Sequence, residues 1–267
     1  MSEIEILAQL DGYPFEVVVT RGAEDRARAL ASRTARAREW LAGVLDVDVE
    51  LTLNVLGPAD WERLAEVPVY GMPHFGADGL VFVAATPPPL FEDLGTMVDQ
   101  DASSEHRAAL RRVYGDELDL SPFMDLLPVH EVAHLGHLSV GVEFAERWLE
   151  ELFCDIALEG YVLEVEPDAR EILETLPLAA RDVDPERLPV SALDRMAEAF
   201  TEGGGVTYGW YQLRLHAAAI PIWKHGGADV LRRLLDAGRR WGGAPSLGQL
   251  ARVHREIARV KREWPGG

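Results

Sequence analysis

The sequence HEVAH at residues 130–134 constrains this chain more than any other stretch. On an α-helix, positions i and i+4 lie about 40° apart around the axis, so His130 and His134 would project from one face toward a single point. Two imidazoles with this spacing can bind one Zn²⁺ ion, each nitrogen about 2.0–2.1 Å from the metal. Glu131 would lie about 100° from His130, beside the ion, where a carboxylate can take a proton from bound water.

Two histidines leave a metal ion with an incomplete set of protein ligands, so a third ligand decides how the motif is interpreted. In the arrangement HExxHxxGxxH the third ligand would be a histidine at position 140. This chain has His137 and Val140 where that arrangement needs glycine and histidine. His137 would lie about 10 Å along the helix from His130, so we interpret it as lining the cleft or supporting a ligand. An acidic residue on the following helix is therefore the expected third ligand.

The following helix is predicted over residues 143–163, with an apolar face centred on Trp148. Glu151 falls on that face, where a carboxylate is costly to desolvate unless it is paired or bound to a metal. Glu150 falls on the opposite side and is interpreted as solvated surface. Glu159 also falls on the apolar face and remains an alternative ligand.

We prefer Glu151 to Glu159 because Asp155 stands one helical turn beyond Glu151. In that position Asp155 could accept the outer N–H of a ligand histidine, which metal sites usually require. The sequence thus predicts one Zn²⁺ ion per chain, bound by His130, His134 and Glu151.

The stretch HEVAH, followed after 16 residues by Glu151 within WLEELFCD (148–155), resembles the gluzincin superfamily of zinc peptidases. Thermolysin, the leukotriene-hydrolase-type aminopeptidases and the minigluzincins belong to this superfamily. WLEELF is similar to the W-L-x-E-x-F stretch of the aminopeptidases, and Glu151 with Asp155 repeats the E-x-x-x-D spacing of thermolysin. The resemblance implies a zincin-like α+β fold, an active-site cleft between two lobes, and a peptide or protein substrate. No GAMEN-like stretch is present, so endopeptidase and exopeptidase action both remain open.

The resemblance also implies a strand at the edge of the cleft and a donor that stabilises the oxyanion. Residues 80–85 (LVFVAA) are the predicted edge strand, and residues 71–76 (GMPHFG) would form the upper lip of the cleft. Tyr211 is the predicted oxyanion donor, with Tyr208 and His216 as alternatives. A role in packing alone also remains open for the two tyrosines.

Hydrophobic periodicity predicts an α/β first part and a helical second part. Strand signals occur at 15–20, 49–56 and 80–85, a helical pattern covers 23–44, and Pro58 begins a short helix. From about residue 103 the patterns are helical, over 103–114, 128–139, 143–163, 168–178, 192–200, 207–219, 227–239 and 246–262. The stretch EGGG at 202–205, glycines at 226–227 and prolines at 87–89 punctuate the chain. We predict one domain over 1–267, with an α/β lobe (1–125) carrying a small mixed sheet and a mostly helical lobe (126–267) carrying the zinc site.

A net charge of −19 argues against phosphate-rich partners, because such a surface repels nucleic-acid backbones and anionic membranes. No stretch approaches the roughly 18 uninterrupted apolar residues of a membrane span, and no secretory signal pattern is present. The single cysteine, Cys154, is expected to be a packed thiol that points away from the apolar helix face. It suits a reducing compartment, so a cytoplasmic location is predicted. The oligomeric state is left open.

The predicted function is that of a zinc metallopeptidase, a hydrolase that cleaves peptide bonds with a zinc-bound water activated by Glu131. Tyr211 would stabilise the oxyanion. Two alternatives remain: a zinc-binding regulatory or scaffold protein of the same fold without turnover, and a helical interaction domain in which HEVAH is an accident. Metal content separates the last of these from the others, and only turnover separates the first two.

Overall fold

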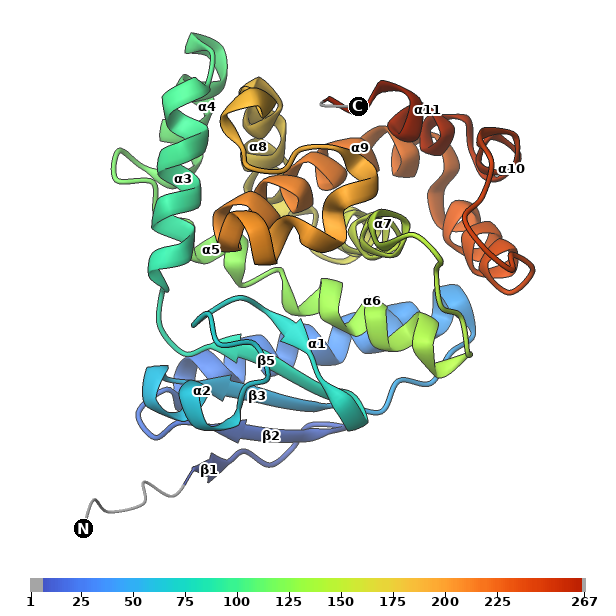
Figure 1. Cartoon of the computed structure of the whole chain (residues 1–267). Coiled ribbons are helices and arrows are strands. Elements are labelled where there is room, and N and C mark those ends of the chain that lie inside the picture. Colours follow the sequence, from blue (N-terminus) through green and yellow to red (C-terminus); the bar gives the residue numbers. More distant parts are fainter. Residues whose placement is uncertain (1–6, 266–267) are drawn as a thin grey trace.

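The computed structural model describes residues 7–265, within which five short strands form one open sheet (Figure 1). The strand order is β1-β2-β3-β5-β4, with bounds Ala8–Gln9, Glu16–Val19, Thr52–Leu56, Leu80–Ala84 and His74–Phe75. β2, β3 and β5 run parallel, whereas β1 and β4 are antiparallel to their neighbours. The strands predicted at 15–20, 49–56 and 80–85 are confirmed, as is a small mixed sheet within an α+β fold.

The edge of the sheet differs from the prediction. β5 is an inner strand, because β4 pairs with it along the side that was expected to be free. His74 lies opposite Phe82, and Phe75 lies opposite Val81. β4 falls in the stretch interpreted as the upper lip of the cleft, and two residues are too few to show an alternating pattern in sequence.

Helices cover both faces of the sheet, which explains why its inner strands are almost continuously apolar. On the face toward the rest of the molecule lie α1 (Glu24–Leu45) and α6 (Pro128–Ser139), which pack on each other (Figure 1). On the other face, Trp61 of α2 (Pro58–Leu64) meets Phe82 of β5 with ring centroids 6.5 Å apart. The HEVAH segment, which belongs to α6, therefore lies between the sheet and the helical part.

The other helices form the helical part together with several short 3-10 turns. They are α3 (Pro89–Asp101), α4 (Ser104–Tyr114), α5 (Ser121–Met124), α7 (Arg147–Val165), α8 (Arg170–Ala179), α9 (Ala199–Gly238), α10 (Leu247–Val253) and α11 (Arg255–Glu263). α3 was not predicted, because three consecutive prolines were interpreted only as the end of the strand region. The last of them, Pro89, instead occupies the first turn of α3, where a missing N–H costs nothing.

α9 is one long helical run that changes direction at two glycines. Gly204 has φ +69° and Gly227 has φ +53°, a region of backbone space that other residues rarely adopt. The punctuation predicted at 202–205 and 226–227 is therefore confirmed as two kinks. The segment between them carries the α9 side chains that face α7.

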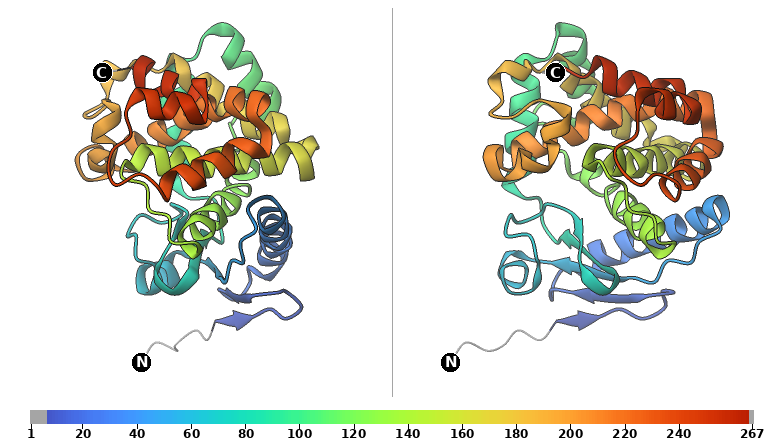
Figure 2. Two further views of the ribbon diagram at one scale, coloured as in Figure 1. Left: turned by 90° about the vertical axis from the view of Figure 1, so that its right-hand side faces the viewer. Right: turned by 45° about the vertical axis from the view of Figure 1, so that its right-hand side comes forward.

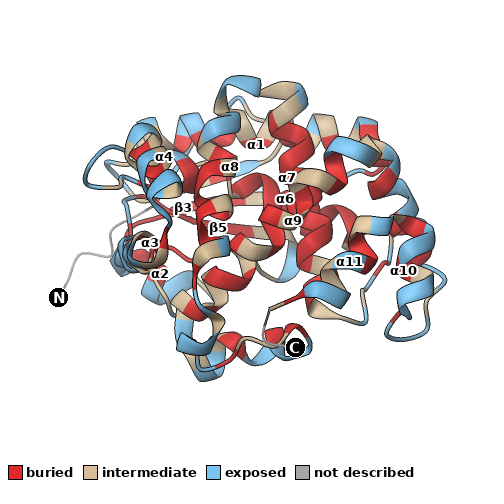
Figure 3. Cartoon of the chain, turned by 90° about the horizontal axis from the view of Figure 1, so that it is seen from above, coloured by how far each residue is buried: buried red, intermediate tan, exposed pale blue. Residues whose placement is uncertain are grey.

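The spatial division between the two parts comes earlier than residue 125. α3 and α4 pack against α8 and α9, and both views of Figure 2 place them with the helical part. Figure 3 shows that buried positions concentrate along α6, α7 and α9 in the middle of the molecule. None of the described helices is long and apolar enough to cross a membrane.

Candidate metal centre

Three helices bring polar side chains to one buried place. α7 lies between α6 and α9 and contacts both. Because residues four apart lie on one helix face, each helix contributes an aligned series. The series are His130 and His134 on α6, Glu151, Asp155 and Glu159 on α7, and Tyr208, Gln212 and His216 on α9.

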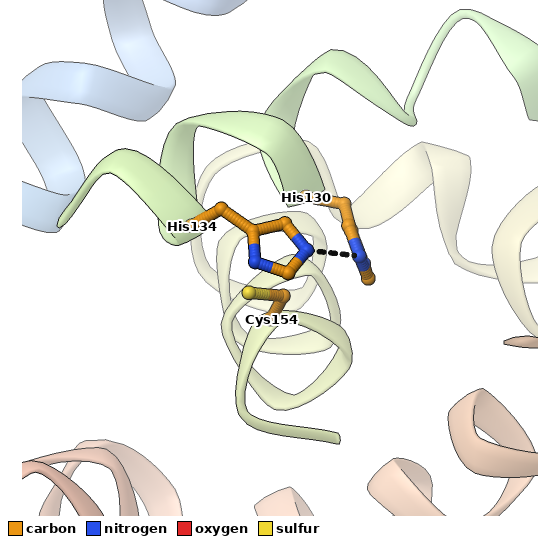
Figure 4. Close-up of side chains that lie close together, drawn as sticks. All are labelled: His130, His134 and Cys154. Carbon is orange, nitrogen blue, oxygen red and sulfur yellow. Dashed lines mark hydrogen bonds between the residues drawn. The ribbon is translucent and has the colours of Figure 1, made fainter. Parts of the chain in front are cut away.

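Three potential ligand atoms converge at the centre of this group. The Nε2 atoms of His130 and His134 lie 3.1 Å apart, the contact drawn dashed in Figure 4. Glu151 Oε2 lies 3.0 Å from Nε2 of His130 and 3.4 Å from Nε2 of His134. The ligands of a tetrahedral ion with bonds of 2.0–2.1 Å are about 3.3–3.4 Å apart, so these three atoms nearly form one face of such a tetrahedron.

The outer nitrogens of the two histidines face carboxylates. His130 Nδ1 lies 3.1 Å from Asp155 Oδ1, and His134 Nδ1 lies 3.2 Å from Glu150 Oε1. If each Nδ1–H donates to its carboxylate, both Nε2 atoms present lone pairs to the same point. Two such lone pairs and a carboxylate oxygen repel one another unless a cation lies among them.

The electrostatics of the group favour a cation. Burial opposes charge on His130, but hydrogen bonds to Asp155 and Glu151 outweigh burial, so the pKa of His130 is raised well above its usual value. Burial alone would raise the pKa of Glu151, yet His134, His130 and Arg147 outweigh it, so this pKa lies well below the usual range. In the metal-free protein the site therefore attracts protons to its imidazoles, and a metal ion would replace them.

Cys154 is an alternative to Glu151 as the third ligand. Its sulfur lies near the two histidines, as Figure 4 shows, so the expectation that it points away from this face is wrong. One donor atom from each of the three residues lies within 4.8 Å of the others, a looser group than the one with Glu151. Burial and then the charges of Glu151 and Glu150 raise the pKa of the thiol well above its usual value, which opposes a thiolate. Glu151 is the better-placed ligand.

Glu150 is not the solvated residue that the sequence suggested. Its side chain is 15% exposed, and Oε1 lies 3.2 Å from His134 Nδ1 and 3.5 Å from His137 Nε2. His137 Nδ1 lies 2.7 Å from Val142 O, to which it can donate. His134, His137 and Glu150 also satisfy the spacing of a metal group. We interpret them instead as hydrogen-bonded support for His134, because a carboxylate that accepts the outer N–H is the usual partner of a metal-bound histidine.

Glu159 does not reach the convergence point. Its Oε2 lies 3.2 Å from His216 Nε2, whose other nitrogen lies 3.4 Å from Asp155 Oδ1. Burial lowers the pKa of His216, but Asp155 and Glu159 outweigh burial and raise it to about 9. His216 is therefore an imidazolium held between two carboxylates, and Glu159 is its partner.

Tyr211 lies outside this site. Its hydroxyl donates to Ala192 O at 2.7 Å, and its ring stacks on Trp264 with centroids 5.6 Å apart. Tyr208 instead lines the cavity, and its hydroxyl donates to Glu151 Oε1 at 3.0 Å. The physical reason is helical spacing, because Tyr208 shares a face with Gln212 four residues later and Tyr211 does not. That polar i, i+4, i+8 series was the sequence signal that could have identified Tyr208.

A cavity of about 430 Å³ opens in front of the convergence point. Glu131 lines it, and among residues 7–265 no side chain or backbone group hydrogen-bonds to its carboxylate. From β4, Phe75 lines the cavity and stacks on His134 with ring centroids 4.7 Å apart. Apolar side chains from α3, α5, η5 (Leu193–Glu198) and α9 also line the cavity, among them Leu90, Leu94, Phe123, Met196, Phe200 and Leu213.

The arrangement therefore combines potential metal-ligand atoms, a carboxylate without a hydrogen-bond partner among the described residues, a phenol and an adjoining cavity. Searches of protein-family models, of curated proteins and of solved structures find no match to this chain.

Proposed function

We propose that this protein is a zinc-dependent hydrolase with a zincin-like site of gluzincin type, and that it cleaves peptide bonds. The observation that carries the proposal is the convergence of His130 Nε2, His134 Nε2 and Glu151 Oε2, with mutual distances of 3.0, 3.1 and 3.4 Å. These three residues would hold one Zn²⁺ ion. When bound, the ion would act as a Lewis acid toward a carbonyl oxygen and lower the pKa of a water.

Charge supports a cation at this place. Of the described side chains that line the cavity, Glu131, Glu151 and Asp155 are acids and Arg147 is the permanently charged base. His216 also lines the cavity and is charged, so with His130 and His134 neutral, as metal ligands must be, the wall has one more negative than positive charge. A buried excess of carboxylates is costly unless a cation offsets it. A divalent ion removes that cost.

Glu131 is the proposed general base. Its carboxylate faces the cavity without a hydrogen-bond partner among the described residues, so it is available to take a proton from an attacking water. The same carboxyl group can return that proton to the nitrogen of the leaving amine. For this role Glu131 needs only a hydrogen bond from a water molecule in the cavity.

Tyr208 is the proposed oxyanion donor in place of Tyr211. Its hydroxyl lies in the cavity wall and donates to Glu151 Oε1, from which it can turn toward a developing oxyanion. Burial and the charge of Glu151 raise the pKa of Tyr208 well above its usual value, so the phenol keeps its proton.

β4 supports a peptide as the substrate class. It is the last strand of the sheet, and both of its residues line the cavity. A strand at an open edge can pair with an extended peptide through its backbone N–H and C=O groups. Such pairing would lay a substrate beside His134 and Glu131.

The test is metal analysis followed by hydrolysis assays on protein purified without chelators. We expect about one zinc per chain and cleavage of a mixture of fluorescence-quenched peptides that stops when a chelator removes the metal. The Glu131→Gln variant should keep its zinc but lose hydrolysis, because only the base is removed. Protein without bound metal would refute the zinc site, and zinc-containing protein that cleaves none of the peptides would favour the zinc-binding scaffold.

A further inference from the structure

The carboxylate of Glu151 is surrounded by more hydrogen-bond donors than an ordinary buried acid needs. Arg147 Nη2 lies 2.6 Å from Oε1, and the Tyr208 hydroxyl donates to the same oxygen at 3.0 Å. Gln212 Nε2 donates to Oε2 at 2.7 Å. Glu151 is fully buried, so these partners are not exchanged for water.

The number of lone pairs determines what each carboxylate oxygen can still bind. A carboxylate oxygen has two lone-pair positions. Before substrate binds, Oε1 uses both of its positions, one for Arg147 and one for Tyr208, and the Arg147 contact is the one that remains when Tyr208 turns toward an oxyanion. Oε2 uses one for Gln212 and keeps one, which faces the Nε2 atoms of the two histidines. Glu151 therefore has a single lone pair available for a metal ion.

We propose that Arg147 is a positioning residue that, with Gln212, makes Glu151 bind the metal ion through Oε2 alone. This inference rests on the proposed function, since it concerns how the metal is held. A one-oxygen glutamate and two histidines give three protein ligands, which leaves a coordination position free for water or substrate. A glutamate that bound through both oxygens would occupy that position.

Arg147 is well placed for this task. It is the first residue of α7, one turn before Glu151, and its guanidinium also lies 3.1 Å from Glu150, which supports His134. The planar fork thus spans the ligand glutamate and the carboxylate behind a ligand histidine. The orientation of the Gln212 amide is also fixed by Glu151. Its Oε1 is buried without a partner, whereas its Nε2 donates to Glu151. Rotating the amide by 180° would place its oxygen next to the Glu151 carboxylate, and the two acceptors would repel each other.

The experiment replaces zinc by Co²⁺, whose visible absorption is intense in four-coordinate sites and weak in five- or six-coordinate ones. We expect the wild-type protein to show the intense four-coordinate band. In Arg147→Leu a lone pair of Oε1 is released, so Glu151 should bind through both oxygens and the band should lose its intensity. Arg147→Lys keeps one donor toward Oε1 and should restore the band.

Zinc affinity, measured by competition with a chromophoric chelator, is the second readout. Loss of an outer hydrogen-bond partner typically weakens metal binding about 10–100-fold, and we expect Arg147→Leu to fall in this range. The matched control is Arg170→Leu, because Arg170 forms the same i,i+4 pair with Glu174, at 2.7 Å, away from the cavity. Circular dichroism verifies that each variant is folded.

The outcomes separate this inference from the proposed function. A wild-type protein that binds no Co²⁺ refutes the metal site, and the inference with it. A wild-type protein that binds Co²⁺ with only the weak band shows that Glu151 or another group already fills the open position, which refutes the inference alone. An unchanged spectrum in folded Arg147→Leu also refutes it, whatever happens to affinity.

Discussion

At the scale of single residues, helix geometry was enough to align the ligand candidates within each helix. His130 and His134 are four apart on one helix, and Glu151 and Asp155 are four apart on the next, so each pair shares a face whatever the rest of the fold does. The placement of Tyr211 could not be obtained in this way. It depends on how α9 is rotated against α7, which tertiary packing decides.

Single substitutions can identify the third metal ligand. We expect Glu151→Gln to reduce bound zinc from about one per chain toward zero, because an amide oxygen lacks the charge that offsets the ion. Cys154→Ser and Glu159→Gln should retain about one zinc, since neither side chain is part of the proposed ligand set. Metal analysis of the three variants decides among them. Loss of zinc in Cys154→Ser with retention in Glu151→Gln would transfer the ligand role to the thiol.

The two tyrosines give opposite expectations. Tyr208→Phe should lower kcat by about 10²–10³ and leave KM nearly unchanged, because an oxyanion donor acts in the transition state. Tyr211→Phe should leave kcat unchanged and lower the free energy of unfolding by about 1 kcal/mol, since its hydroxyl donates to Ala192 O. Steady-state kinetics and urea unfolding of both variants test this. A Tyr208→Phe enzyme with full kcat would leave Tyr208 without a catalytic role.

At the scale of elements, periodicity identified the longer helices and the three inner strands but missed α3 and the short elements α5, β1 and β4. A parallel strand buried on both faces produces a continuous apolar run, as in LVFVA of β5, and such a run is visible in sequence. β4 has only two residues, His74 and Phe75, and pairs with a strand that begins a few positions later. The sequence of these two residues alone does not indicate the pairing. Long-range packing also determines which helices meet, and this set the surroundings of Glu150 and Cys154.

The contact between Glu166 and α1 should make the free energy of unfolding depend on pH. Glu166, which follows α7, accepts hydrogen bonds from Arg33 and Arg36 of α1 and from Tyr161. Burial would raise the pKa of Glu166, but Arg33, Tyr161 and Arg36 outweigh it and lower the pKa to about 2. A carboxyl group with a lowered pKa stabilises the fold above its unfolded pKa of about 4.3, and this contribution is lost as the pH falls toward 2.

Glu166→Gln should therefore lower the free energy of unfolding by about 2 kcal/mol at pH 7. The difference from wild type should shrink between pH 4.5 and about 2.5, where wild-type Glu166 begins to be protonated. Urea unfolding curves at several pH values measure it. Glu171→Gln is the control, because the Glu171 side chain is 73% exposed and lies 4.0 Å from Arg112. A difference that stays constant down to pH 2.5 would contradict the assignment.

At the scale of the whole molecule, the sequence predicted an α+β fold with a helical second part, and the described residues show both. It did not predict where the division lies in space, because α3 and α4 precede residue 125 yet pack with the helical part. The candidate site lies where α6, against the sheet, meets α7, which in turn packs on α9. Its cavity is therefore lined by β4, by the loop before it and by helices.

The two kinks in α9 set limits on how this chain can change in length. Tyr208, Gln212 and His216 all lie between Gly204 and Gly227, within one helical segment and before Pro221. An insertion before Gly204 or after Gly227 would leave their mutual alignment intact, because each kink separates the segment from the rest of the run. One residue added between positions 208 and 216 would rotate the later side chains by about 100° relative to the earlier ones, away from α7. Insertions and deletions should thus be absent between Tyr208 and His216, whereas the run outside the two glycines can accommodate them.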